Sequence, residues 1–179
     1  YQGKNQWVLG VSDPDIADVS GSNGFESDND AAGSTNSPKT DAKFTNVSIF
    51  GPLQTPATVI NSNFRRALHI RRCSWLDVYN SVFTGFPVGF KIEGACTIDG
   101  FTTGNEQDFK NNILAGISGN TIEPTPDAAV SNQFTNYNNS ILTSVSDVMA
   151  TDPFNDTKPN FLPMAGSPLL SGADFGSAN

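Results

Sequence analysis

The sequence is poor in the residues from which many catalytic and metal sites are built. It contains one histidine and two cysteines, and charged residues make up only 16% of its 179 residues. A zinc site of Cys and His ligands needs about four such residues at suitable spacing, and this chain does not supply them. A Ser-His-Asp triad is also disfavoured, because His69 stands among arginines and no Gly-x-Ser-x-Gly motif is present.

Long hydrophobic runs are missing as well. No stretch is long and apolar enough to cross a membrane, and no signal peptide is visible. The formal net charge of −8 argues against a nucleic-acid partner, because phosphate binding needs a basic patch. The chain opens at Tyr1 rather than Met, so we expect a processed protein or a part of a larger one, secreted to the extracellular space or the cell surface.

Helical periodicity is nearly absent, whereas short apolar runs between Gly, Asn and Pro are frequent, which is typical of an all-β protein. A short motif of Asn followed by an apolar run recurs, starting at Asn46, Asn80, Asn111 and, more loosely, Asn139. The step from one copy to the next is about 28–34 residues, and self-similarity at such a period indicates stacked repeats. A β-sandwich would need more hairpin signals than the chain has. We therefore predict a right-handed parallel β-helix (a solenoid), with Asn in left-handed corners that stack along the axis.

The predicted organisation is a single domain over residues 1–179. Residues 12–43 form a long acidic loop, residues 44–146 hold the repeats, and residues 147–179 form an irregular closing tail. A loop of about 30 residues is unusual in a compact domain and is generally functional or flexible. The first strand of such a stack has an open edge, so we expect upstream coils, a partner chain or the long loop to cover it.

Several segments resemble the C-terminal part of secreted, pectate-lyase-like β-helix proteins of Bacteroidetes-type bacteria. The similar segments are residues 22–30, 44–52, 69–72 with 76–85, and 160–170. The resemblance covers roughly residues 20–175 and implies a parallel β-helix and an extracellular location. Because the group is largely uncharacterised, it implies little about activity.

All four arginines lie in one short segment, residues 65–72, beside the only histidine. On a strand, alternation places Arg65, His69 and Arg71 on one exposed face and Arg66 and Arg72 on the other. Guanidinium groups bind carboxylates through paired hydrogen bonds. Arg65, His69 and Arg71 are therefore a candidate anion or glycan site for an acidic polysaccharide. The alternative is that the arginines pair with the acidic loop of the chain itself.

The long loop carries the candidate metal ligands. Calcium takes about six to eight oxygen ligands, and closely spaced acids supply them. The candidate calcium ligands are Asp13, Asp15, Glu26, Asp28 and Asp30. The spacing is not that of an EF-hand. An ordinary solvated loop, or a loop folded onto the arginines, is the alternative.

The two cysteines are Cys73 and Cys96. In an oxidising compartment they are able to form a disulfide. The other interpretation is two buried thiols that act as small hydrophobic side chains.

Two functions from different classes follow. The first is a non-catalytic extracellular module, structural or glycan-binding; Trp7, Trp75, Tyr79 and Phe86 are candidate sugar platforms or core residues.

The second function is that of a polysaccharide lyase or glycoside hydrolase. The resemblance implies that a lyase would use calcium with a basic residue such as Arg65, Arg71 or Lys91. A glycosidase needs paired carboxylates, for which the candidates are Asp77, Glu93 and Asp99.

Overall fold

The computed structural model describes residues 2–104 and 106–176. The prediction of an all-β, right-handed parallel β-helix is wrong. The chain is mixed α/β, 14% helical and 32% strand, with several parallel sheets, and its described part forms no solenoid or closed sheet. Two segments that lack a clear helical period fold as helices, α1 at Ala95–Thr103 and α2 at Ala128–Asn136. No helix among the described residues is long and apolar enough to span a membrane.

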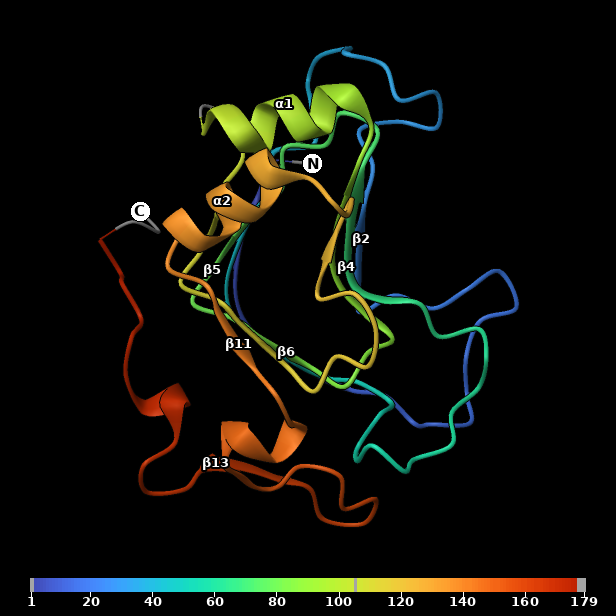
Figure 1. Cartoon of the computed structure of the whole chain (residues 1–179), viewed down its shortest axis with the longest axis vertical. Coiled ribbons are helices and arrows are strands. Elements are labelled where there is room, and N and C mark those ends of the chain that lie inside the picture. The colour runs from blue at the N-terminus through green and yellow to red at the C-terminus, as the bar shows by residue number, and fades with distance from the viewer. Residues whose placement is uncertain (1, 105, 177–179) are drawn as a thin grey trace.

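Two parallel sheets face each other, and α1 and α2 lie side by side along a third side (Figure 1). The larger sheet has the order β11-β9-β6-β3-β5-β8, and β1 also pairs with β3. Its strands are β1 Lys4–Val11, β3 Lys43–Phe50, β5 Asp77–Tyr79, β6 Val82–Thr84, β8 Phe109–Lys110, β9 Ile113–Ala115 and β11 Ser140–Leu142. The second sheet, ordered β10-β7-β4-β2, holds β2 Phe25–Ser27, β4 Arg66–Arg71, β7 Val88–Glu93 and β10 Ile122–Glu123.

The core between the sheets and helices combines aliphatic side chains with a group of packed phenylalanines. The rings of Phe90 and Phe109 stack with centroids 4.6 Å apart, and Phe101 from α1 and Phe134 from α2 pack against Phe90 at 5.3 and 6.0 Å. Each helix buries only a few side chains, with Val130 and Phe134 as the buried residues of α2. So narrow an apolar face gives almost no helical period, which is why the sequence pattern did not reveal these helices.

A column of asparagines marks the corner where the larger sheet bends. The backbone has positive φ at Asn46 (55°), Asn80 (51°), Asn111 (56°) and Asn138 (56°). Asparagine tolerates this left-handed conformation better than most residues. The fourth member is Asn138 and not Asn139 as predicted, because Ser140 pairs with Ile113 and this register aligns Asn139 with Asn112.

A buried polar ladder runs beside this column. The Val47 amide donates to Ser81 Oγ (3.0 Å), and the Ser81 amide donates to Asn112 Oδ1 (2.9 Å). The Asn112 amide in turn donates to Asn139 Oδ1 (2.9 Å). These side chains supply partners to backbone groups that the bend takes out of regular strand pairing, and buried backbone groups need such partners.

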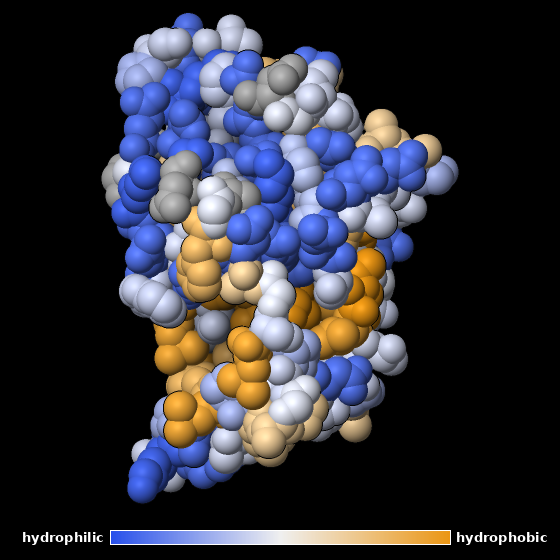
Figure 2. All heavy atoms as spheres, turned by 90° about the vertical axis from the view of Figure 1, so that its left-hand side faces the viewer, coloured by the Kyte–Doolittle hydropathy of each residue, from blue (hydrophilic) through white to orange (hydrophobic). Residues whose placement is uncertain are grey.

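The C-terminal segment covers the part of the outer face of the larger sheet that surrounds Phe50. It contains the 3₁₀ helices η1 (Val145–Val148) and η2 (Pro168–Leu170) and the antiparallel strands β12 (Ala150–Asp152) and β13 (Asn160–Pro163). The ring of Phe50 meets the rings of Phe154 and Phe161, with centroids 5.8 and 5.4 Å away. On the side of the molecule that Figure 2 shows, hydrophobic side chains gather in the lower half. The tail covers the apolar part of the outer face formed by Phe50, Val82 and Ala115.

Candidate functional site

The arginine-rich segment forms β4, and its polar side chains line the outer face of the second sheet. The register places Glu26 of β2, His69 of β4, Lys91 of β7 and Glu123 of β10 opposite one another in one row across four strands. The neighbouring row, which contains Leu68 and Phe90, belongs to the buried core. Side-chain alternation therefore explains why charges collect on one face of this sheet.

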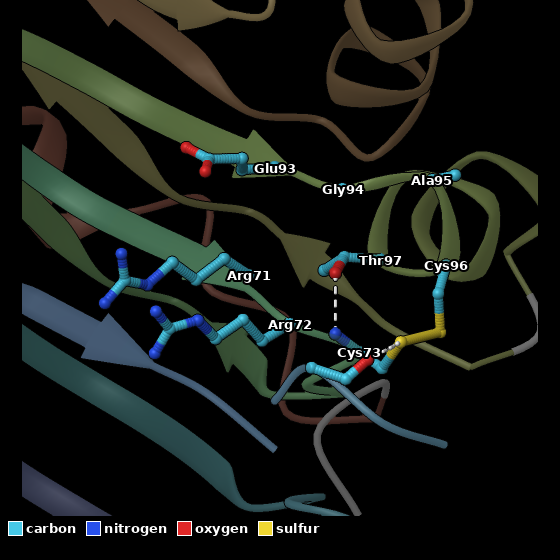
Figure 3. A pocket seen from close by; sticks show the side chains of 9 residues that line it. Arg71, Arg72, Cys73, Glu93, Gly94, Ala95, Cys96 and Thr97 are labelled. Carbon is cyan, nitrogen blue, oxygen red and sulfur yellow. Dashed lines mark hydrogen bonds between the residues drawn. A yellow bond between two sulfur atoms is a disulfide. The ribbon is translucent and has the colours of Figure 1, made fainter. Parts of the chain in front are cut away.

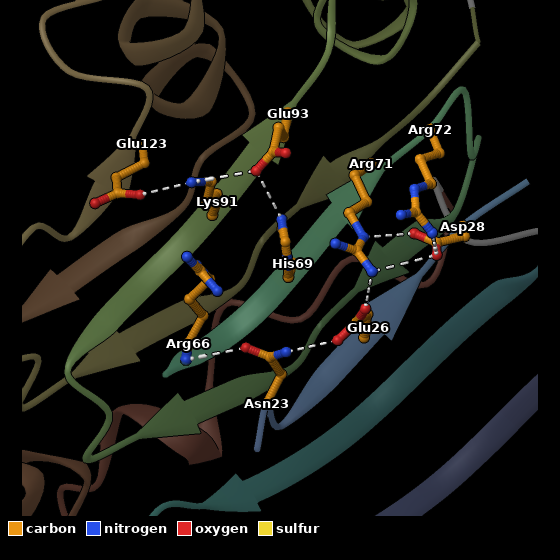
Figure 4. Close-up of polar contacts among 10 residues, drawn as sticks. All are labelled: Asn23, Glu26, Asp28, Arg66, His69, Arg71, Arg72, Lys91, Glu93 and Glu123. Carbon is orange, nitrogen blue, oxygen red and sulfur yellow. Dashed lines mark hydrogen bonds and ion pairs between the residues drawn. The ribbon is translucent and has the colours of Figure 1, made fainter. Parts of the chain in front are cut away.

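Arg71 is bound by acids from the long loop (Figure 4). Its Nε donates to Asp28 Oδ1 (2.8 Å), and its Nη2 also donates to Glu26. Arg72 donates from Nη1 to Asp28 Oδ2 at 2.9 Å. The hydrogen bond to Asp28 raises the pKa of Arg71 above its already high value. We call this set, formed by Glu26, Asp28, Arg71 and Arg72, the β2–β4 latch.

His69 and Lys91 also have internal acidic partners. His69 Nε2 lies 3.1 Å from Glu93 Oε2, and Lys91 Nζ lies 3.2 Å from Glu93 and 3.4 Å from Glu123. Burial lowers the pKa of His69, so the imidazole is neutral near pH 7. The hydrogen bond from His69 lowers the pKa of Glu93.

Two arginines remain without acidic partners among the described residues. Arg65 is exposed and forms no ion pair there. Arg66 forms none either, and its Nε is buried without a hydrogen-bond partner; its amide donates to Asn23 Oδ1 (3.2 Å), which ties it to the long loop. The structure thus divides the predicted anion site: His69 and Arg71 are engaged internally, and only Arg65 is open.

The five candidate calcium ligands do not meet. Asp13 accepts a hydrogen bond from the Asp15 amide (2.8 Å), and Asp30 accepts one from the Ser34 amide (3.0 Å). Glu26 and Asp28 belong to the latch. In the part of the chain that the structure describes, no group of three or more His, Cys, Asp or Glu side chains is placed to hold a metal ion.

The cysteines are joined in a disulfide that links the end of β4 to α1. A pocket of about 300 Å³ lies beside this disulfide at the start of α1, and the Cys73 amide there donates to Thr97 Oγ1 (2.9 Å; Figure 3). Arg71 and Arg72 line the pocket, but their guanidinium groups extend away from the helix (Figure 3). The charged groups of this pocket therefore do not converge on a ligand.

A second polar cluster, which the sequence pattern did not reveal as a unit, lies on the outer face of β3, β5 and β8. Asp77 binds Lys43 Nζ (2.9 Å) and the amide of Asp108 (2.8 Å). Asp108 accepts hydrogen bonds from the Tyr79 hydroxyl (2.9 Å) and from Lys110 Nζ (2.8 Å). Burial raises the pKa values of Asp77 and Tyr79. The signal in the sequence was spacing, since Lys43, Asp77 and Asp108 follow one another at intervals of one repeat.

The candidate glycosidase acids lie on separate elements. Asp77 is on β5, Glu93 ends β7 beside His69 and Lys91, and Asp99 is exposed on α1. Asp77 instead shares a hydrogen-bond network with Asp108, which was not among the candidates.

The four candidate sugar platforms do not form one exposed aromatic surface. Tyr79 and Phe86 are buried, and Lys39 Nζ covers the ring of Trp75 at 3.4 Å. Trp7 alone of the four has a largely exposed side chain.

No protein-family model matches this chain, and neither a curated protein nor a solved structure matches it. The resemblance to secreted pectate-lyase-like proteins stays a prediction.

His69 makes the stability depend on pH. Its pKa is below the ordinary value of 6.5 in the fold, so below that pH the unfolded chain binds more protons and stability falls. We expect unfolding free energy to decrease from pH 7 to pH 5, and less steeply in His69→Gln. Urea unfolding at several pH values measures both slopes. Equal slopes in the two proteins would contradict this assignment.

Proposed function

We propose that this chain is a non-catalytic extracellular module with a structural role at the cell surface. The observation that carries the proposal is the β2–β4 latch, in which Glu26 and Asp28 neutralise Arg71 and Arg72. A disulfide between Cys73 and Cys96 supports an oxidising, extracellular location, because disulfides are rare in reducing compartments.

The latch supports a structural role because it occupies the groups that an acidic ligand would need. Arg71 uses Nε and Nη2 on the carboxylates of the loop, so a bound uronic acid would have to displace them. Lys91 is held between Glu93 and Glu123 in the same manner. The positive charge of β4 therefore holds β2 and the residues that follow it beside β4, where β2 forms one edge of the second sheet.

A second candidate function, hydrolysis of an acidic polysaccharide, is favoured by one observation. Asp77 and Asp108 share a hydrogen-bond network, and the raised pKa of Asp77 is a property that general acids of glycosidases have. Against it, Asp77 is only 6% exposed and its Oδ2 is bound to Lys43. A substrate would have to displace Lys43 before reaching it.

The latch is tested by comparing Arg71→Ala with Arg65→Ala, a matched change of a neighbouring arginine that has no ion pair among the described residues. Arg71 is partly exposed, so solvent screens its pairs and we expect Arg71→Ala to cost about 1 kcal/mol of unfolding free energy. Arg65→Ala should change it by less than about 0.5 kcal/mol. Chemical denaturation measures both. We also expect wild type and Arg65→Ala to bind no acidic glycan on an array, with or without calcium.

The opposite pattern would refute the structural proposal. Binding of acidic glycans by wild type, lost in Arg65→Ala or Arg71→Ala, would establish a glycan site. Release of sugars from an acidic polysaccharide, abolished by Asp77→Asn in a folded protein, would establish the second function instead.

A further inference from the structure

The first strand, β1, exposes large hydrophobic side chains that no other described part of the fold covers. Trp7 is 75% exposed, Leu9 54% and Val11 50%. Ile16 and Val19, which follow β1 in the chain, are exposed as well. Single exposed hydrophobic residues are ordinary, whereas a contiguous group on one strand marks an interaction surface.

The outer face of β1 continues an apolar surface that is already covered elsewhere. Val11 pairs with Phe50 and Leu9 with Ser48. Phe50 is buried under Phe154 and Phe161 of the tail. The tail therefore covers the outer face at Phe50 of β3 but not on the neighbouring strand β1. There, Leu9 and Val11 continue the same apolar face and are exposed to solvent.

β1 is also an edge strand in the part of the larger sheet that the structure describes. β1 is eight residues long and pairs only with β3 among the described strands. From Trp7 to Val11 its other edge pairs with no strand that the structure describes, and an edge of this kind is a template for pairing with another strand. Of the devices that usually block such pairing, β1 carries a single charge, Lys4, and no proline.

Trp7 occupies a backbone position that suits it poorly. The register places it opposite Asn46, at the head of the asparagine column, and its φ is 62°. Every other described member of the column is an asparagine. A bulky aromatic residue at positive φ is a clear outlier, and such strain concentrates where a side chain has a function. The strain and the exposure of the same indole point to a contact that the described part of this chain does not supply.

We propose that β1 is the interface of a two-fold dimer, and that its occupant is β1 of a second copy of this chain. Charge favours this occupant at this position. The chain carries a net charge of −8, but residues 2–12 contain no acid and one lysine, so two copies approach here without the like-charge repulsion expected elsewhere. A two-fold axis brings the same patch of both copies together.

The dimer has a defined geometry. The two β1 strands run antiparallel and join the larger sheets of both copies into one continuous sheet, which leaves neither β1 edge open. Leu9 and Val11 of each copy then lie on the outer face beside the partner strand. Trp7 covers the apolar side chains of the other copy.

The experiment is sedimentation velocity on the whole chain from about 1 µM to about 1 mM, with Leu9→Lys, Trp7→Asn and the control Leu162→Lys. Leu162 is an exposed hydrophobic residue on β13, away from β1. We expect a monomer–dimer equilibrium for wild type and Leu162→Lys, and a dissociation constant raised by about tenfold or more in the two β1 variants. Trp7→Asn should also melt at the same or a higher temperature as a dilute monomer, because asparagine suits this corner. That result separates a lost interface from a damaged fold.

Three outcomes would overturn the proposal. The first is a wild type that stays monomeric over the whole range. The second is a dimer that Leu9→Lys and Trp7→Asn leave unchanged. The third is open-ended growth beyond the dimer, which would indicate head-to-tail pairing of β1 with β11 of the next copy.

Discussion

Replacement of Asn112 by alanine is expected to lower the unfolding free energy by about 2–5 kcal/mol, because buried hydrogen-bonding groups would lose their partners. Asn112 is fully buried, and its Oδ1 accepts from the Ser81 amide. Its Nδ2 donates to Val78 O (3.0 Å) and to Asn139 Oδ1 (3.1 Å). Alanine would leave the Ser81 amide and the Val78 carbonyl without these bonds, in a place too well packed for water to reach easily. Urea unfolding measures the loss.

The neighbouring asparagine provides the control. Asn111 has positive φ and is only partly buried, and glycine adopts that conformation without strain. Asn111→Gly should therefore cost less than about 1 kcal/mol. If the two variants proved equally stable, the ladder would not contribute to stability as argued.

Removal of the disulfide should produce the second large effect. The bond joins Cys73 to Cys96 at a sequence separation of 23, and for a loop of this length the chain-entropy model gives a loss of about 3 kcal/mol on replacement of both cysteines by serine. The measurement is the denaturation midpoint of wild type and of Cys73→Ser/Cys96→Ser, each with and without a reductant. We expect the reductant to destabilise wild type alone.

The disulfide variant also bears on location. If the reductant leaves wild type unchanged and its two thiols react freely in the folded protein, the bond is not formed in solution, and the extracellular proposal loses one of its supports. A protein that is exported through an oxidising compartment should instead contain no free thiol before unfolding.

The repeats and the asparagine corners could be predicted from the sequence, but the fold class could not. Asn46, Asn80 and Asn111 stand at left-handed corners as expected, because asparagine and glycine are the residues that signal such a backbone locally. The helices were missed because α2 buries only Val130 and Phe134 and α1 contains Gly100. Packing on the phenylalanine core, a tertiary effect, decides that these segments are helical.

For the arginine-rich segment the sequence predicted two alternatives, an anion site for an acidic polysaccharide or arginines paired with the acidic loop. Alternation placed His69 and Arg71 on the face of β4 opposite Leu68 and Ile70, but the prediction that His69 is exposed is wrong, because its side chain is buried beside Glu93. Pairing with acids depends on the path of the long loop, which no local pattern encodes. Arg72 was assigned to the core-facing register, yet it is exposed, because positive φ at Arg72 and Cys73 ends the strand alternation after Arg71. The network of Asp77 and Asp108 was not predicted, because residues spaced by one repeat come into contact only once their parallel strands pair.

The parallel pairing of the sheets has a consequence for how the chain folds. Lys43 pairs with Asp77, Val82 with Ile113 and Ile113 with Ser140, so each contact joins segments that are one repeat apart in the sequence. Among the described strand pairs, only β12 and β13 run antiparallel. The entropy of closing each loop is lost before its strand contacts form, which places folding on the millisecond-to-second scale of proteins rich in non-local contacts. Each strand added to a sheet has an unpaired edge until the next strand pairs with it. Partly folded molecules are therefore the form most prone to aggregation.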